Sequence, residues 1–249
     1  MTTIGDPAGA GSRAAGAGSR AAEAGTGAAG AGARHRRNAR GQGNRLADDI
    51  VRGALAIVER TGSDEAVTLR AVAREVGIAA PSIYAHFADR EAIIMAAVVQ
   101  IFDELTEVVA AAQTAAGADP VQRLLAGCQA YLKYGLGHPA RYGLLFAPRG
   151  VLPDGYCPPP TIGTDGRPDL PFGTEAFAQL IQGIQNCVDA GVSASKDVLA
   201  DATAVWVALH GTVTLRTALG AFPWPELTAF NRQLVLPLAH VTTGHTATD

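Results

Sequence analysis

Apolar residues return at the spacing of an α-helix along most of the chain from residue 45 onward. Within 45–61 five of them form one stripe: Leu46, Ile50, Ala54, Ile57 and Val58. Gly62 follows, and glycine readily takes the positive φ that often ends a helix. The pattern therefore predicts a first amphipathic helix over 45–61.

Two short helices joined by a tight turn are predicted next. The segment 68–76 has an apolar face made of Leu69, Val72, Ala73 and Val76, and Gly77 interrupts it. Pro81 suits the first turn of a second helix, where its missing N–H is not needed. Ile83 and Phe87, four residues apart, then face inward. Small and hydrogen-bonding residues remain outside, which suits insertion into a DNA major groove: Pro81, Ser82, Tyr84 and Ala85.

The helical pattern continues to the end of the chain. Asp89 is a good N-cap for a long amphipathic helix that extends past Leu105. Further helices are predicted over four ranges, with a short element from His138: 121–137, 174–190, 196–219 and 225–241. Because no strand pattern is visible, we predict an all-α fold. The Pro- and Gly-rich segment 148–173 is a long loop, and its role as pocket lid, dimer arm or plain insertion stays open.

The first 43 residues differ from the rest in composition. Ala and Gly dominate them, and Ile4 is the only large aliphatic residue after Met1, so we predict a disordered tail. The tail carries six Arg against Asp6 and Glu23, while residues 44–92 hold six Arg and eight acidic residues. The cluster RHRRNAR over 34–40 is either a solvated part of this tail or an arm that contacts DNA phosphates or the minor groove.

Several classes of protein are not supported by the motifs. The chain has no G-x-S-x-G and no Walker loop, which argues against an enzyme, and its six His residues follow no metal-ligand spacing. We therefore predict no metal and no cofactor. Cys128, Cys157 and Cys187 are scattered, as expected for reduced thiols, and Cys157 is either a redox sensor or an incidental thiol. With no secretory signal and no stretch near the length of a membrane span, we expect a cytoplasmic protein without a membrane partner.

The run TLRAVAREVGIAAPSIYAHFADREAI resembles the DNA-binding domain of TetR-family transcriptional regulators, and the resemblance covers about 46–105. It implies a three-helix helix-turn-helix domain over 44–92. It also implies nine DNA-contacting residues: Thr68, Arg70, Ala79, Ala80, Pro81, Ser82, Tyr84, His86 and Arg90. The partner is then a double-stranded DNA operator.

The resemblance also assigns roles to these positions. Thr68 would cap the second helix and contact a phosphate, and Arg70 would read a base such as guanine. At Ala80 the family often has a polar base reader, whereas an alanine offers only a methyl group, which suits either a thymine contact or a close approach of the backbone to DNA. Phosphate contacts are implied for Tyr84, His86 and Arg90. For His86, packing at the edge of the core is the alternative, and Arg74 is expected to be solvated or to face a phosphate.

A second resemblance covers the C-terminal part. WVALHGTVTLR, together with HPARYGLLF, resembles a TetR-family C-terminal domain of the Trp-His-Gly type, here Trp206, His210 and Gly211. Gly211 would allow close helix packing. The resemblance implies a pocket for an apolar or aromatic effector. Nine residues are candidates for its lining, although each also suits the core: Tyr131, Tyr134, Tyr142, Phe146, Phe177, Ile181, Gln185, Trp206 and His210.

The same resemblance implies a homodimer formed by the last two helices, within an effector-binding and dimerisation domain over 93–244. Apolar residues there exceed what a monomer surface needs: Val205, Leu209, Val213, Leu219, Leu227, Leu234, Leu238 and Val241. The expected function is a ligand-responsive repressor that binds a palindromic operator and is released by a small molecule. An activator, or a ligand-independent DNA-binding protein of the same fold, is the alternative.

Overall fold

A computed structural model describes residues 42–146, 161–162, 168–169 and 174–242. All of them belong to one compact unit, Ala39–Asp249. The predictions for the tail up to residue 41, including its Arg cluster, and for Cys157 lie outside the described residues. So does most of the loop predicted over 148–173.

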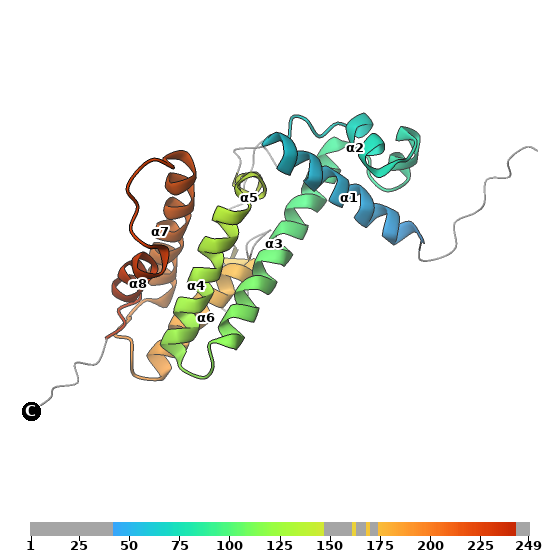
Figure 1. The fold of residues 1–249 in the computed structure, drawn as a ribbon. Coiled ribbons are helices and arrows are strands. Elements are labelled where there is room, and N and C mark those ends of the chain that lie inside the picture. Colours follow the sequence, from blue (N-terminus) through green and yellow to red (C-terminus); the bar gives the residue numbers. More distant parts are fainter. Residues whose placement is uncertain (1–41, 147–160, 163–167, 170–173, 243–249) are drawn as a thin grey trace, which may run out of the picture. The chain divides into compact units, whose positions relative to one another are not determined.

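The described part of the chain is built from helices (Figure 1), as predicted. In chain order they are α1 Gln42–Thr61, α2 Leu69–Val76, the 3₁₀ helix η1 Ala80–Ala85, α3 Arg90–Ala115, α4 Pro120–Gly137, α5 Pro139–Leu145, α6 Thr174–Asp189, α7 Val198–Ala218 and α8 Leu227–Leu238. Two strands of two residues each, β1 Thr161–Ile162 and β2 Pro168–Asp169, form an antiparallel pair. The sequence pattern indicated no strand, because two residues are too few to show a period.

Capping side chains decide where the last two helices begin. The carboxylate of Asp197 accepts a hydrogen bond from the Ala200 N–H at 3.0 Å, so α7 starts at Val198. Glu226 accepts from the N–H groups of Thr228 and Ala229 and so precedes the first residue of α8. Both starts fall two residues after the predicted ones, since periodicity alone does not show which residue caps a helix.

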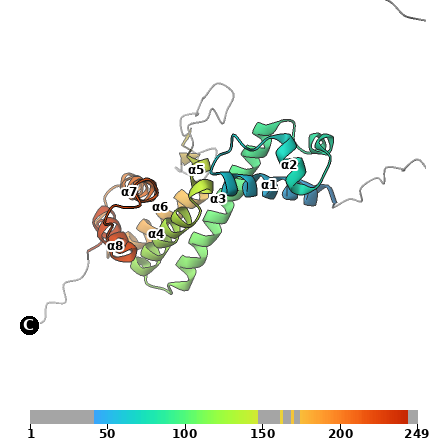
Figure 2. The same ribbon diagram turned by 45° about the horizontal axis from the view of Figure 1, so that its top comes forward.

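Helix α3 passes from the predicted DNA-binding domain into the C-terminal domain without a break (Figure 2). It packs against α1 near one end and against α4, α5 and α6 along the rest of its length. Seven of its residues are buried: Ile93, Ile94, Ala97, Val98, Ile101, Leu105 and Val109. The predicted boundary between 92 and 93 therefore lies inside a helix that serves both parts.

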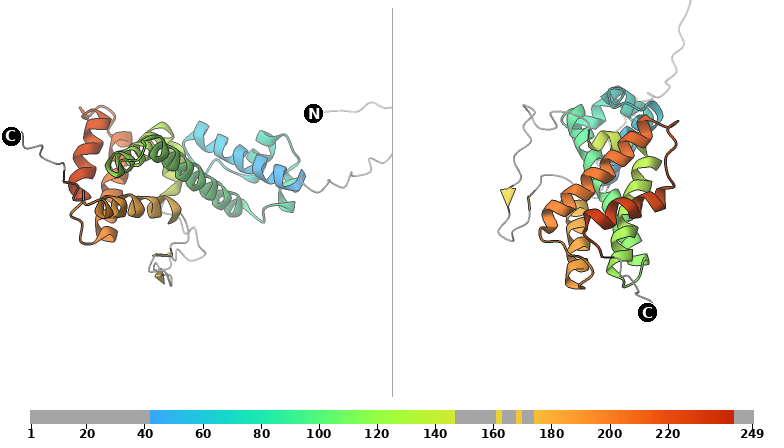
Figure 3. Two further views of the ribbon diagram at one scale, coloured as in Figure 1. Left: turned by 90° about the horizontal axis from the view of Figure 1, so that it is seen from below. Right: turned by 90° about the vertical axis from the view of Figure 1, so that its left-hand side faces the viewer.

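Helix α4 lies at the centre of the C-terminal part, where it contacts α3, α6, α7 and α8 (Figure 3). Its Gly135 permits the close approach of α7. A Cβ at this position would lie 2.7 Å from Val213 Cγ1 and 2.9 Å from Tyr142 Cδ2. No side chain fits there unless these neighbours move, so the glycine determines how closely the two helices pack.

Helix α7 corrects one prediction. By length and composition alone it could cross a membrane, so the expectation that no stretch reaches that length is wrong. The helix is that apolar because it contains no Glu or Lys, and its single Asp and single Arg, Asp201 and Arg216, lie near its ends. One face packs against α4, α6 and α8, yet only 28% of the most apolar window is buried.

The two faces of α7 also correct three of the eight residues expected at a dimer interface. Val205, Leu209 and Val213 are buried within the chain itself, where they contribute to the core. The apolar residues left exposed on this helix are different ones, including Leu199, Val207 and Leu215. The interface prediction chose large apolar residues without knowing which face of α7 the rest of the chain covers.

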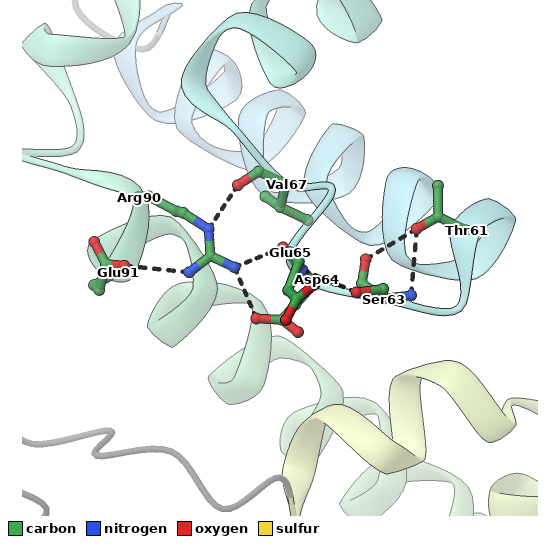
Figure 4. Close-up of polar contacts among 7 residues, drawn as sticks. All are labelled: Thr61, Ser63, Asp64, Glu65, Val67, Arg90 and Glu91. Atoms are coloured by element: carbon green, nitrogen blue, oxygen red, sulfur yellow. Dashed lines mark hydrogen bonds and ion pairs between the residues drawn. The ribbon is translucent and has the colours of Figure 1, made fainter.

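Arg90, the first residue of α3, holds the loop between α1 and α2 (Figure 4). Its Nε donates a hydrogen bond to the Val67 carbonyl at 2.8 Å. Its Nη2 donates to both the carbonyl and the carboxylate of Asp64, at 2.6 and 2.7 Å. Burial by itself lowers the pKa of Arg90, but the hydrogen bonds and charges of Asp64 and Glu91 outweigh it and raise the pKa. The guanidinium thus stays charged and ties α3 to the loop.

We predict that Arg90→Met lowers the free energy of unfolding by about 1–3 kcal/mol, because it removes the hydrogen bonds that the guanidinium donates to Asp64 and to the Val67 carbonyl. Urea unfolding followed by the helical circular dichroism signal measures the change. Arg52→Met is the matched control: Arg52 pairs with Asp49 on the surface, and its loss should change stability by no more than about 0.5 kcal/mol. Equal losses in the two variants would contradict the role given to Arg90.

Candidate DNA-binding surface and aromatic cluster

The turn between α2 and η1 has the geometry that the sequence predicted. The Thr68 hydroxyl accepts a hydrogen bond from the Ala71 N–H at 3.1 Å and caps α2. Gly77 ends the helix in the left-handed region, with φ of 75°. Val72 and Ala73 of α2 and Ile83 of η1 are buried, so the two elements share a small core.

The element predicted as a second helix from Pro81 is a six-residue 3₁₀ helix, η1. A 3₁₀ helix has three residues per turn, so its side chains line up in columns three residues apart. Ile83 is fully buried, and Ala80 in the same column is half-buried against the core. Ala80 therefore points mainly inward, away from the surface on which it was expected.

The other two columns of η1 face solvent. One holds Pro81 and Tyr84, and the other holds Ser82 and Ala85. Tyr84 is 61% exposed, which is unusual for an aromatic residue and leaves both its ring and its hydroxyl available. Ala79, just before η1, is exposed as well. His86 is half-buried at the end of η1, where its backbone N–H donates to Ile83.

Ion pairing separates five of the six arginines of residues 44–92 into two groups. Arg52, Arg60 and Arg90 are held by carboxylates. Arg70 and Arg74 are exposed on α2 and have no carboxylate partner within the described part of the chain. The net negative charge of residues 44–92 therefore does not extend to the surface of α2. There, two arginines four residues apart are available to bind an anion.

Arg90 is placed differently from the other residues expected to contact DNA. Its Nε and one terminal nitrogen already donate to Val67 and Asp64, and the other terminal nitrogen lies 3.2 Å from Glu91. Since the side chain is directed into the loop between α1 and α2, the structure favours an internal role for it. The contacts of the other expected residues stay predictions.

A buried hydrogen-bond relay joins α4, α5 and α7 in the C-terminal part. The hydroxyls of Tyr131 and Tyr142 lie 2.7 Å apart, and the Tyr142 hydroxyl lies 2.8 Å from His210 Nδ1. Burial raises the pKa of Tyr131 to about 12, against the opposing effect of hydrogen bonds with Tyr142 and Trp206. Burial also raises the pKa of Tyr142 and lowers that of His210. All three groups are therefore neutral near pH 7.

Aromatic rings extend this relay toward the surface. Phe146 lies edge-on to His210 with 4.4 Å between ring centroids, and Phe177 lies 5.8 Å from Trp206. Trp206 itself is 37% exposed. Six of the nine predicted lining residues thus form one aromatic cluster: Tyr131, Tyr142, Phe146, Phe177, Trp206 and His210.

The other three predicted lining residues are placed otherwise. The Tyr134 hydroxyl donates to Glu104 at 3.2 Å. The Gln185 amide donates to Asp189 on its own helix at 2.8 Å. Ile181 packs against the core, half-buried. Tyr134 and Gln185 therefore direct their polar groups to partners outside the aromatic cluster.

Arg141 of α5 connects the two parts of the chain, and sequence reasoning missed it. Its Nε lies 2.5 Å from Glu59 of α1, and its Nη1 donates to Glu104 of α3 at 2.7 Å. His138 Nδ1 lies 3.7 Å from the same Glu59. Arg141 stands next to Tyr142 in the chain, but Glu59 and Glu104 are distant in sequence, so no local pattern could have paired them.

Two cysteines are described, and both are free thiols buried in the core. Burial raises the pKa of Cys128 to about 12 and that of Cys187 to about 11. Thiols with such values are poor nucleophiles near pH 7. Within the described ranges, no group of three or more His, Cys, Asp or Glu residues is arranged to hold a metal ion.

Comparison with known proteins agrees with the two parts of the chain. Residues 50–97 match the model for bacterial regulatory proteins of the tetR family, and residues 124–235 match that for the tetracyclin repressor-like C-terminal domain. An uncharacterized HTH-type transcriptional regulator of Mycobacterium tuberculosis is 30% identical over 95 residues. That match spans 38% of this chain and 42% of the relative.

Solved structures share the fold over most of the chain. A Rhodococcus protein of unknown function superposes with a TM-score of 0.63 at 19% identity, covering 84% of this chain and 97% of its own. A TetR family transcription regulator from Marinobacter aquaeolei has a TM-score of 0.57 at 14% identity, with coverage of 80% and 98%. The transcriptional regulator FadR from Bacillus subtilis, solved in complex with stearoyl-CoA, gives 0.57 at 14% identity and coverage of 77% and 97%. With both domain models matched in chain order, this chain belongs to the TetR family of transcriptional regulators.

Proposed function

We propose that this protein represses transcription as a homodimer on a palindromic operator, and that an uncharged apolar or aromatic small molecule releases it. The exposed surface of α2 and η1 carries the proposal. It gathers Ser82 and Tyr84 with Arg70 and Arg74, which have no carboxylate partner among the described residues. Arginines bind phosphates and guanine edges, and short helices of this kind enter the major groove. Activation would need the same contacts and differs only in where the operator lies relative to the promoter.

The outer face of α7 supports the dimer. Val207 and Leu215 are 59% and 50% exposed, and Gly211 lies between them on the same row of the helix. Among the described residues, no atom outside the helix lies within 4 Å of the place where a Gly211 side chain would begin. A glycine inside a helix lowers its stability by about 1 kcal/mol relative to alanine. An apolar face with a glycine at its middle suits the close approach of α7 from a second copy.

The aromatic cluster supports the class of effector. Its polar groups are neutral, so it favours an uncharged ligand that stacks against the rings of Trp206 and Phe146. Helix α5 supplies the connection to DNA binding, because consecutive residues face different partners. Tyr142 belongs to the relay, whereas Arg141 is paired with Glu59 of α1. A crevice of about 200 Å³ lies beside this contact, between the end of α1 and α5, and Val58, Pro139 and Gly143 are among the residues that line it.

Selection of random duplex DNA by the full-length protein tests the core of the proposal. We expect a palindromic consensus whose two half-sites lie about one helical turn, or a multiple of it, apart. The Arg70→Ala variant, put through the same selection, should lose discrimination at one position per half-site. Uniform weakening in this variant would make Arg70 a phosphate contact. Absence of any enriched sequence would refute sequence-specific binding.

The dimer is tested by a charge placed on the outer face of α7. We predict that Val207→Glu halves the mass measured by light scattering after gel filtration and removes tight binding to the palindromic operator. Gly211→Leu should do the same, because its side chain would keep two α7 helices apart. Val108→Glu is the control, since Val108 is an exposed aliphatic residue of α3 away from this face. A dimer that survives both α7 substitutions would contradict the proposed interface.

Coupling through α5 is tested without knowing the effector. We predict that Tyr142→Phe changes the free energy of operator binding. This change should differ by about 0.5–2 kcal/mol between the protein with Arg141 and the Arg141→Met variant. The double-mutant cycle is measured by fluorescence anisotropy on the selected operator. The pair Tyr142→Phe and Arg123→Met is the control, because among the described residues the Arg123 side chain bonds only the Gly117 carbonyl, just before α4. Strict additivity of the Tyr142 and Arg141 substitutions would exclude α5 as the connection.

A further inference from the structure

The outward surface of η1 carries no charged side chain and no amide. Its two solvent-facing columns hold Pro81 with Tyr84, and Ser82 with Ala85. We propose that this surface reads thymine by its C5 methyl group, and that Ala85, not Ala80, is the alanine that makes the contact. The inference rests on the proposed binding of DNA and specifies the base chemistry of the half-site.

The 3₁₀ geometry separates the two alanines. With three residues per turn, Ala80 shares a column with the fully buried Ile83, and its methyl group packs against the core. Ala85 shares a column with exposed Ser82 and is itself exposed. In an α-helix, residues four apart would share a face, and the spacing would not place Ala80 inward and Ala85 outward in this way.

The chemistry of the major groove selects among the bases. Adenine and guanine are read by bidentate partners such as Asn, Gln or Arg, and cytosine is read by a carboxylate acceptor. None of these side chains projects from η1, whose only outward hydrogen-bonding groups are the hydroxyls of Ser82 and Tyr84. Thymine is the base that also offers an apolar group in this groove, and that methyl group can pack against the Ala85 methyl.

Neighbouring residues do not replace this contact. The Arg90 guanidinium is held by Asp64 and Val67, and the His86 ring is half-buried at the end of η1. Arg70 lies on α2, so its guanine contact would fall at a different base pair from those under η1. The half-site should therefore combine one guanine with a thymine-containing step facing η1.

Replacement of thymine by deoxyuridine removes only the methyl group and keeps base pairing, so it tests the proposal directly. On the selected operator, each thymine position is changed in both half-sites and the affinity of the full-length protein is measured. Loss of one buried methyl contact corresponds to a weakening of about fourfold per half-site, or about 15-fold for the pair. We expect this loss at one or two positions, with no change at the others.

Replacing each of the two alanines by glycine identifies the side chain that contacts the thymine methyl group. In Ala85→Gly the deoxyuridine penalty should fall to about twofold or less, whereas in Ala80→Gly it should stay as in the unchanged protein. Comparing the two duplexes within each variant cancels any difference in folding. Equal penalties in the two variants, or no penalty at any thymine, would overturn the inference. A protein that selects no operator at all would instead refute the proposed function.

Discussion

The continuity of α3 is the constraint on which the other arrangements depend. Its buried residues from Ile93 to Val109 pack against α1 near one end and against α4, α5 and α6 farther along. Arg90 at its start holds the loop that leads into α2, and Glu104 farther along holds Arg141 of α5. A helix hydrogen-bonded throughout bends little without a proline or an inserted group. Because α3 contains no proline, its sequence supplies no kink between the two parts.

Charge and burial are distributed in opposite ways in the two candidate functional regions. At α2 and η1 the candidate groups are exposed, and Arg70 and Arg74 have no carboxylate partner among the residues that the structure describes. In the aromatic cluster the polar groups are buried and neutral, since desolvation opposes their charged forms. The first arrangement suits a highly charged polymer, and the second suits an uncharged small molecule.

Between these regions, α5 is short and makes contacts of both kinds. Tyr142 contributes to the neutral relay, while Arg141 bridges carboxylates on α1 and α3. Arginine suits this position because its planar group can meet two carboxylates at once. The other face of α7 is covered by the chain. On the outer face, no atom of the described residues outside the helix lies within 4 Å of the point where a Gly211 side chain would begin.

The sequence by itself determined the helical segments, the turn at Gly77, the cap at Thr68 and the relation to TetR regulators, because these depend on local periodicity and turn chemistry. It also identified six aromatic and histidine residues that do meet in one cluster. Which face of each helix is covered was decided by the tertiary structure. Ala80 turned inward with the 3₁₀ geometry, Arg90 turned to the Asp64 loop, and Val205 turned into the core. The pairing of Arg141 with Glu59 and Glu104 was likewise beyond the sequence, because apolar spacing reports that a face is buried but not which distant segment covers it.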